Sequence, residues 1–239
     1  MDIKLVIYYL CIAAGGVLSA VIGYNFGRKS GFQKDTLRTY IGFGLLSGIF
    51  SAFLMGQLQN FIMSQTGLDF YPNRLRIFGA LLFLPLCFFV LTRLIGGDFG
   101  KVTDIFTAGT FVMLGFSKIG CAVYGCCYGI PFEHGVTTPF QEFRAFPVQL
   151  LECALCLITA LIAFLIFRNK KHRKGTVYPI SLILYGVMRF FAEFLRYYPE
   201  EERSYFFGIN FWQMICVISI LFAAVLLCPA IKQVKAERE

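Results

Sequence analysis

Two basic residues stand alone inside long apolar stretches, Lys118 in GTFVMLGFSKIGCAVYGCCYG and Arg189 in YPISLILYGVMRFFAEFLR. An ionised side chain at membrane depth is costly, so it is retained where it has a partner or a function. Tyr185, Arg189, Glu193 and Arg196 follow each other at helical spacing, which predicts one polar stripe on a single helical face. Arginine offers paired donors to phosphate oxygens, so this surplus of positive charge predicts a phosphate site. The alternative is an internal ion pair of Arg189 with Glu193 that only ties helices together.

The elements that position these residues are predicted to be membrane-spanning helices. Hydrophobic residues make up 57% of the 239 residues, charged residues 15%, and the mean hydropathy is +0.68. A soluble domain of this length has a charged fraction nearer a quarter. We therefore expect an all-α, polytopic membrane protein that forms a single domain over residues 1–239. Seven apolar segments are long enough to span a bilayer: 5–24, 40–58, 77–94, 105–124, 148–167, 177–195 and 207–227.

Basic residues predict the orientation of these helices, because they are in excess in cytoplasmic loops. Fourteen of the 22 Lys and Arg residues fall on one side of the seven segments and six fall on the other. The asymmetry predicts that the N-terminus lies outside and the C-terminus in the cytoplasm. Membrane orientation explains the net charge of +8, so no nucleic-acid partner is expected.

The orientation brings polar residues of three helices to a similar depth. Lys118 follows Ile105 by 13 residues, which places it roughly 20 Å from the inner edge of a core about 30 Å thick. Arg189 lies at a similar height in the sixth segment. The fifth segment begins near the outer edge with Gln149 and Glu152. We expect these side chains to converge in the outer part of the bilayer, where an anionic lipid headgroup supplies the phosphate.

Three of the nine cysteines, Cys121, Cys126 and Cys127, cluster where the fourth segment ends. The other six fit as small apolar residues of helices. For the cluster, a disulfide of Cys121 with one of its neighbours, a thiol that takes part in chemistry, and small-residue packing all stay open. No metal site is expected, because His134 is the only histidine nearby.

Three segments of the chain resemble motifs of one known family, the bacterial prolipoprotein diacylglyceryl transferases. Residues 117–129, SKIGCAVYGCCYG, resemble the family signature G-R-x-G-N-F-x-N-x-E-x-x-G. Residues 146–152, FPVQLLE, resemble H-P-S-Q-L-Y-E, and residues 184–196, LYGVMRFFAEFLR, resemble L-Y-G-x-x-R-F-x-x-E-x-x-R. The motifs occur in the family's order, within seven helices and with the family's orientation.

The resemblance implies a reaction in the bacterial cytoplasmic membrane. Members transfer the diacylglyceryl group of phosphatidylglycerol to a cysteine thiol of a secreted prolipoprotein and release glycerol phosphate, and no cofactor or metal is implied. The implied partners are an anionic phospholipid, an acceptor protein or peptide thiol, and the bilayer. The catalytic candidates are Arg189, Glu193, Tyr185, Cys126, Cys127 and Glu152. The substrate-binding candidates are Lys118, Arg189, Arg196, Gln149, Gly129, Cys121 and Arg76.

The chain also departs from these motifs. Lys118 replaces the signature arginine, and Cys121 and Cys126 replace an asparagine and a glutamate. Phe78 and Phe146 stand where the family has histidines. These changes predict a divergent, cysteine-rich branch. One hypothesis is that Cys126 or Cys127 replaces the missing imidazole base, and a structural disulfide with Cys121 or plain packing is the alternative. A non-catalytic protein that binds or transports anionic lipid and an exofacial thiol oxidoreductase are the alternative functions.

Overall fold

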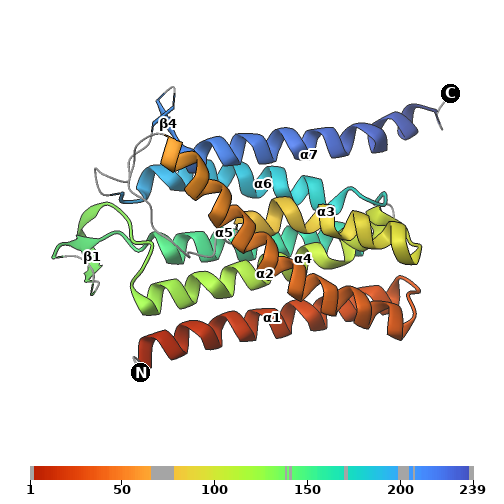
Figure 1. Cartoon of the computed structure of the whole chain (residues 1–239), viewed down its shortest axis with the longest axis horizontal. Helices are drawn as coiled ribbons and strands as arrows, with labels where there is room; N and C mark the ends of the chain where they lie inside the picture. The colour runs from red at the N-terminus through yellow and green to blue at the C-terminus, as the bar shows by residue number, and fades with distance from the viewer. Residues whose placement is uncertain are drawn as a thin grey trace.

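The structure is a computed structural model that describes residues 3–65, 78–137, 139, 142–169, 172–198, 205–206 and 208–236. Within these ranges the chain forms seven α-helices and two small antiparallel sheets (Figure 1). The helices are α1 (Ile3–Lys29), α2 (Lys34–Gln65), α3 (Phe78–Ile95), α4 (Phe99–Tyr124), α5 (Val148–Arg168), α6 (Val177–Ala192) and α7 (Phe211–Ala236). The strands are β1 (Pro131–Thr137), which pairs with β2 (Arg144–Ala145), and β3 (Tyr205–Phe206), which pairs with β4 (Ile209–Asn210).

The helices confirm the predicted class of an all-α, polytopic membrane protein. Six of the helices in the described residues are long and apolar enough to cross a membrane. The predicted third span falls on α3, whose apolar part, Gly79–Ile95, is shorter and contains Pro85. Seven spans were predicted, and six helices meet the length and hydropathy needed to cross a membrane. The difference lies at α3 alone. The orientation of the termini stays a prediction.

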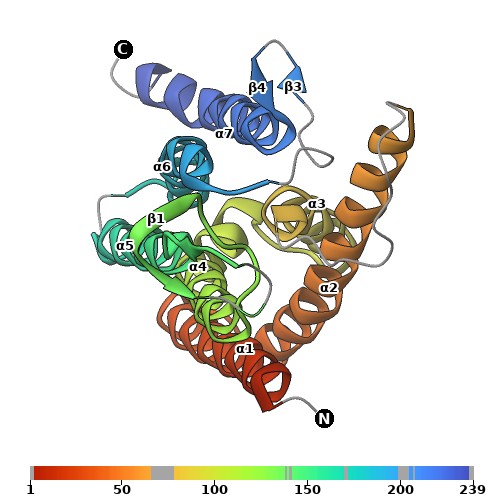
Figure 2. The same ribbon diagram turned by 90° about the vertical axis from the view of Figure 1, so that its left-hand side faces the viewer.

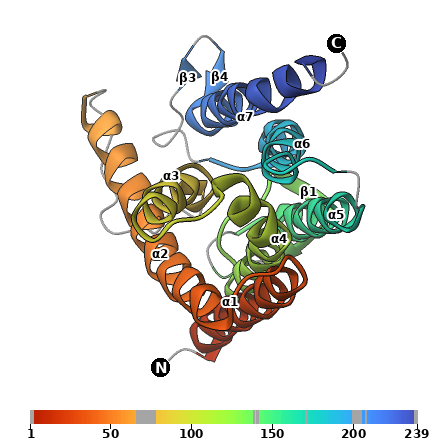
Figure 3. The ribbon, with the colours of Figure 1, turned by 90° about the vertical axis from the view of Figure 1, so that its right-hand side faces the viewer.

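Helix α4 lies at the centre of the bundle. It packs along α1 on one side and α5 on the other, and it also contacts α3 and α6 (Figure 2). Helix α7 packs on α6, and α2 crosses the bundle obliquely beside α3 (Figure 3). Helix α1 begins at the end of the bundle that carries the small sheets, and α7 ends at the opposite end (Figure 1). Polar residues of α4 therefore face neighbours on several sides.

Glycines allow the close approach of α1 to α4. A Cβ atom at Gly109 of α4 would lie 2.7 Å from the carbonyl oxygen of Ser19 in α1. A Cβ atom at Gly15 of α1 would lie 2.8 Å from the Cβ atom of Phe116 in α4. Small residues are common where helices associate inside membranes, because they let the backbones meet. The glycines thus fix α4 against α1.

The start of α6 is held by a side chain from α4. Thr176, at the N-cap position of α6, makes no side-chain capping bond. The Asp104 carboxylate instead accepts hydrogen bonds from the backbone N–H groups of Gly175, Val177 and Tyr178, at 2.6, 2.9 and 3.3 Å. The first N–H groups of a helix have no partner within it, and an anion there is favourable. Asp104 therefore fixes the position of α6, the helix that carries Arg189.

Helix α7 begins four residues later than the predicted span. Asn210 Oδ1 accepts a hydrogen bond from the backbone N–H of Gln213 at 2.8 Å, and Gln213 Oε1 accepts one from the backbone N–H of Asn210 at 3.0 Å. This reciprocal pair is a capping box, which marks a helix start. The preceding residues belong to the β3–β4 sheet. The apolar run alone did not reveal this boundary.

Candidate active site

A buried carboxylate lies at the centre of an ion cluster formed by three helices and the chain after α6. Glu152 of α5 has a fully buried side chain. It pairs with Lys118 of α4, and its Oε1 atom lies 3.3 Å from Arg189 Nη2 and 3.3 Å from Arg196 Nη1. One carboxylate therefore holds the three basic residues that the sequence analysis had singled out.

A second buried carboxylate, Glu193, extends the cluster. It pairs with Arg189 one helical turn before it and accepts a hydrogen bond from the hydroxyl of Tyr198. The side-chain amide of Asn210 donates to Glu193 Oε1 at 3.4 Å. Arg189 thus bridges the two carboxylates, and Asn210 connects the cluster to the start of α7.

The cluster carries surplus positive charge. Three cations face two carboxylates, so one positive charge remains uncompensated within the group. The side chains of Lys118 and Arg196 are 13% exposed, whereas that of Arg189 is 4% exposed. Lys118 and Arg196 are therefore the cations that an incoming anion can reach. Electrostatic attraction is strong at such a site because water is largely excluded.

The polar stripe on the sixth helix is shorter than predicted. Helix α6 ends at Ala192, Glu193–Leu195 continue as a 3₁₀ turn, and Arg196 has an extended backbone. Arg196 nevertheless reaches Glu152, because the chain turns back toward α5. Tyr185 lies in the core, where its ring packs against Phe111 with centroids 5.4 Å apart.

A crossing of backbone segments holds the three family-like motifs together at Gly129. The N–H of Gly129 donates to the carbonyl of Phe146, and the N–H of Ile130 donates to the carbonyl of Leu195, at 3.1 and 3.0 Å. Gly129 also forms an isolated bridge with Arg196. A Cβ atom at Gly129 would lie 2.6 and 2.7 Å from the carbonyl oxygens of Phe146 and Leu195. Only glycine fits here, because the backbones approach closely. Gly129 therefore supports the site through its backbone contacts.

The three clustered cysteines lie at the end of α4, Cys121 in its last turn and Cys126 and Cys127 just after it. Gly125, with φ of 89°, ends the helix in the left-handed conformation, and Cys127 has a φ of 58°, which is rare for a residue with a side chain. The sulfur atoms of Cys121, Cys126 and Cys127 lie within 4.8 Å of one another, and all three cysteines are free. Gln149 donates from Nε2 to the carbonyl of Cys126 at 2.8 Å and so ties this loop to α5.

The thiols after α4 differ in acidity. Hydrogen bonds from Cys121 and Cys126, with the nearby charges of Arg196 and Lys118, hold the pKa of Cys127 below its ordinary value. A hydrogen bond from Cys121 lowers the pKa of Cys126, but its interaction with Cys127 and burial outweigh this and raise that pKa to about 12. Cys127 is therefore the thiol most easily present as a thiolate. Three sulfur atoms are one ligand fewer than a structural zinc site uses.

Two residues of the site were missed by the sequence analysis, and one candidate is not placed. Tyr198 and Asn210 both contact Glu193, but neither belongs to an apolar segment with a polar stripe. The spacing of Asn210 and Gln213 was a signal that could have shown a helix start there. Arg76, predicted to bind substrate, lies outside the described residues.

Fold and site together define a multi-pass membrane protein with a buried, net-positive ion cluster at one end of its helix bundle. The profile of the prolipoprotein diacylglyceryl transferase family matches residues 1–229. The chain therefore belongs to this family and is a transferase, as the motifs predicted.

Several relatives match nearly the whole chain. The phosphatidylglycerol–prolipoprotein diacylglyceryl transferase of Clostridium tetani is 27% identical over 90% of this chain and 90% of its own. Enzyme 2 of the same name from Clostridium perfringens is 24% identical over 99% of this chain and 94% of its own. The corresponding enzyme of Nitratidesulfovibrio vulgaris is 29% identical over 84% of this chain and 79% of its own.

Proposed function

We propose that this protein transfers the diacylglyceryl group of phosphatidylglycerol to a cysteine thiol of a prolipoprotein. The acceptor sulfur forms a thioether bond with the glyceryl carbon that carries the phosphate. The bond between that carbon and the phosphate oxygen breaks, and glycerol phosphate leaves with the bonding electrons. The phosphate therefore gains one negative charge during the step, while the thiol loses a proton.

The surplus positive charge of the cluster is the observation that supports this proposal. Lys118 and Arg196 contact the phosphate, because their side chains are the partly exposed cations. Arg189 holds them in place through Glu152 and also binds Glu193. Charge that develops on the leaving phosphate is stabilised by fixed cations in a site with little water, which is the kind of stabilisation that accounts for much of enzymatic rate enhancement.

The acceptor thiol needs a base, and Cys127 takes this role in the proposal. Phe146 stands where the family motif has a histidine. Cys127 has a pKa held low by its thiol neighbours and by Arg196 and Lys118. Its thiolate offsets the surplus positive charge of the resting site. When the thiolate accepts the proton of the acceptor thiol, that positive charge becomes available to the leaving phosphate, and Cys127 returns the proton to solvent after the product leaves, so no oxidant or reductant is consumed.

The reaction is proposed to take place at the outer leaflet of a bacterial cytoplasmic membrane. Lys118 lies near the C-terminal end of α4, after which β1 begins, so the ion cluster lies toward the end of the bundle that carries the β1–β2 sheet (Figure 1). The excess of basic residues in the opposite loops supports an outward orientation of this end. A secreted acceptor would reach the site from that side.

The test is a transfer assay with the purified protein, phosphatidylglycerol and a peptide that contains one cysteine. Mass spectrometry should show a peptide that has gained the diacylglyceryl group and an equal amount of glycerol phosphate. Arg189→Ala should abolish transfer, and Arg189→Lys should restore little of it, because an ammonium group cannot bind two carboxylates in fixed geometry. Arg93→Ala is the matched control, since Arg93 is exposed and lies over the ring of Phe89.

Other results would contradict the proposal. Retention of phosphatidylglycerol without any product would indicate a lipid-binding protein. Exchange of thiols and disulfides with the peptide, without gain of lipid, would indicate an oxidoreductase. Near-normal transfer by a well-expressed Arg189→Ala variant would place the reaction elsewhere in the chain.

A further inference from the structure

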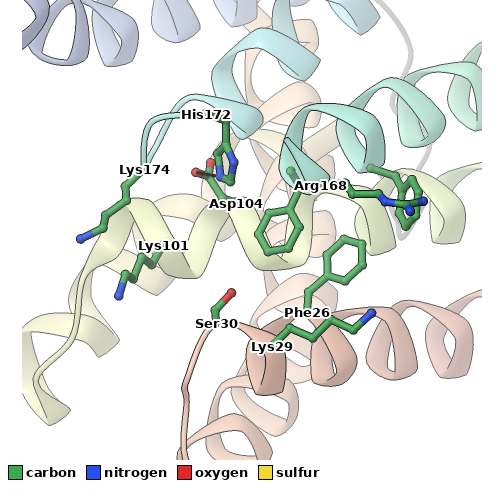
Figure 4. A pocket seen from close by; sticks show the side chains of 10 residues that line it. Phe26, Lys29, Ser30, Lys101, Asp104, Arg168, His172 and Lys174 are labelled. Carbon is green, nitrogen blue, oxygen red and sulfur yellow. Dashed lines mark ion pairs between the residues drawn. The ribbon is translucent and has the colours of Figure 1, made fainter. Parts of the chain in front are cut away.

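A cavity lies at the end of the bundle opposite the ion cluster. Its volume is about 720 Å³, within the range of about 300–1,000 Å³ that is typical of ligand pockets. The end of α1, the start of α4, the end of α5 and the segment before α6 surround it (Figure 4). Lys101 lies in the first turn of α4, whereas Lys118 and the cysteine cluster lie near its other end. The cavity and the proposed active site are therefore separated by most of the length of α4.

One wall of this cavity is aromatic. The ring of Phe26 stacks on that of Phe167, with centroids 4.4 Å apart, and lies 5.7 Å from that of Phe164. The ring of His172 continues the row beside Phe167 at 5.4 Å. Phe164 is 37% exposed, at the side of α5 where a membrane helix meets lipid. An apolar part of a ligand can therefore enter from the bilayer and contact the rings.

Unpaired cations surround the same cavity. Within the described part of the chain, the side chains of Lys29, Lys101 and Arg168 have no carboxylate within ion-pair distance. Lys174 differs, because its ammonium lies 3.6 Å from Asp98. The three unpaired side chains come from three different helices, α1, α4 and α5.

The acidic residue in the wall does not neutralise these cations. Asp104 accepts three backbone hydrogen bonds at the start of α6, and its Oδ2 atom lies 3.9 Å from Nε2 of His172 (Figure 4). Its carboxylate is 2% exposed and is occupied by these contacts. The cavity therefore stays strongly positive around an apolar wall.

The orientation of the helices explains why basic residues are abundant at this end. It does not explain a cavity that is lined by basic residues of three helices and by a row of phenylalanines. We propose that this cavity binds one anionic phospholipid from the leaflet opposite the active site, with its acidic headgroup held by the cations that line the cavity, Lys29 and Arg168 on one side and Lys101 on the other (Figure 4). The first carbons of its acyl chains lie against Phe26 and Phe164. This lipid is bound and not consumed, so the inference is independent of the transfer reaction.

The apolar wall favours a membrane lipid over a soluble phosphate as the ligand. Basic pockets between membrane helices on the cytoplasmic side bind acidic headgroups, because both charge and acyl contact contribute. A free phosphate ion would make no contact with the apolar wall that Phe26 and Phe164 form. The experiment distinguishes the two sources.

The test counts lipids on the full-length protein in neutral detergent by native mass spectrometry. The probes are phosphatidic acid, which lacks the glycerol headgroup of the proposed substrate, phosphatidylcholine, and inorganic phosphate. The pocket variant replaces Lys29, Lys101 and Arg168 with glutamine. The control variant replaces three exposed cations outside the cavity with glutamine, Lys34, Arg38 and Arg93, so that both proteins lose the same charge.

The pocket variant should bind one phosphatidic acid fewer than the wild type, with affinity at that site about 100-fold lower. This follows from a factor of about five for each basic residue near an acidic lipid. The control variant should bind like the wild type, and phosphatidylcholine should not compete. If the pocket variant does not fold, Phe164→Glu provides a second route, because a carboxylate at the edge of the cavity should expel the same lipid.

Three results would overturn the proposal. Equal loss of lipid in the pocket and control variants would show a general effect of charge. Unchanged lipid binding in the pocket variant, or in a folded Phe164→Glu variant, would show that the cavity holds no lipid. Displacement of phosphatidic acid by millimolar inorganic phosphate would assign the cavity to a soluble anion.

Discussion

Glu152 shares one negative charge among Lys118, Arg189 and Arg196, and replacing it with glutamine removes that charge while keeping the shape of the side chain. The side chain is fully buried, so solvent cannot compensate for the loss. Removing one partner of a buried ion pair costs about 3–5 kcal/mol. For a chain of this size a loss of 1 kcal/mol lowers the unfolding midpoint by about 2–4 °C. We therefore expect Glu152→Gln to lower the midpoint by about 6–20 °C.

The transfer assay adds a second reading of the same variant. The surplus charge of the cluster rises from one to two, so the KM for phosphatidylglycerol should not increase. The kcat should fall, because Lys118 and Arg196 lose the group that fixes their positions. Glu133→Gln is the matched control, since Glu133 lies exposed on β1 and should change the free energy of unfolding by less than about 0.5 kcal/mol.

A double variant tests whether Glu152 and Lys118 stabilise the protein as one cluster or through independent contacts. If Glu152 and Lys118 act as one unit, Glu152→Gln combined with Lys118→Met should cost less than the sum of the two single changes. A midpoint for Glu152→Gln within about 1 °C of the wild type, or strictly additive effects in the double variant, would refute the central role assigned to this carboxylate.

Further expectations concern the backbone crossing, the cysteines and the orientation. Gly129→Ala should destabilise the protein by about 1–3 kcal/mol, because its Cβ atom would lie 2.6 Å from a carbonyl oxygen; Gly48→Ala, with no atom within 4 Å, should be harmless, and equal midpoints for the two would contradict this account. Alkylation of Cys127 by iodoacetamide should stay fast below pH 8.5, the ordinary thiol pKa, and slow only as pH falls through its lowered pKa; a rate that falls tenfold per unit from pH 8.5 would exclude a stabilised thiolate. In intact cells an impermeant thiol reagent should label a single cysteine placed at Glu133 and miss one placed at Lys34, and the reverse pattern would invert the predicted topology.

The membrane class and most helices could be predicted from the sequence because they depend on long apolar runs. The same runs do not show at which residue a helix begins or ends, because local hydrogen bonds set these boundaries. Helix α7 starts at its capping box and α6 ends at Ala192, so the stripe from Tyr185 to Arg196 is not one helical face. The predicted third span, 77–94, in contrast coincides with α3 to within one residue at each end, although the helix contains Pro85.

The charged residues of the candidate site were predicted from the sequence, but the residues that contact Glu193 were not. Lys118, Arg189 and Glu152 were found because ionised groups in apolar segments are costly and therefore informative. Tyr198 and Asn210 carry no such signal, since Tyr198 follows a predicted segment and Asn210 lies near the start of one, and uncharged polar residues are ordinary at both places. Their contact with Glu193 depends on how the chain turns after α6, which is a tertiary property that helix periodicity does not encode.

The crossing at Gly129 consists of main-chain hydrogen bonds, and such bonds form whatever the neighbouring side chains are. The loop after α4 can therefore exchange its side chains while its path stays the same, provided that position 129 remains glycine. This gives a physical reason why a cysteine at position 126 coexists with membership of the family. It also means that Cys126→Glu, which restores one residue of the family's motif, can be introduced into this chain without rebuilding the loop. The same backbone can therefore be used to compare a thiol and a carboxylate at one position of the site.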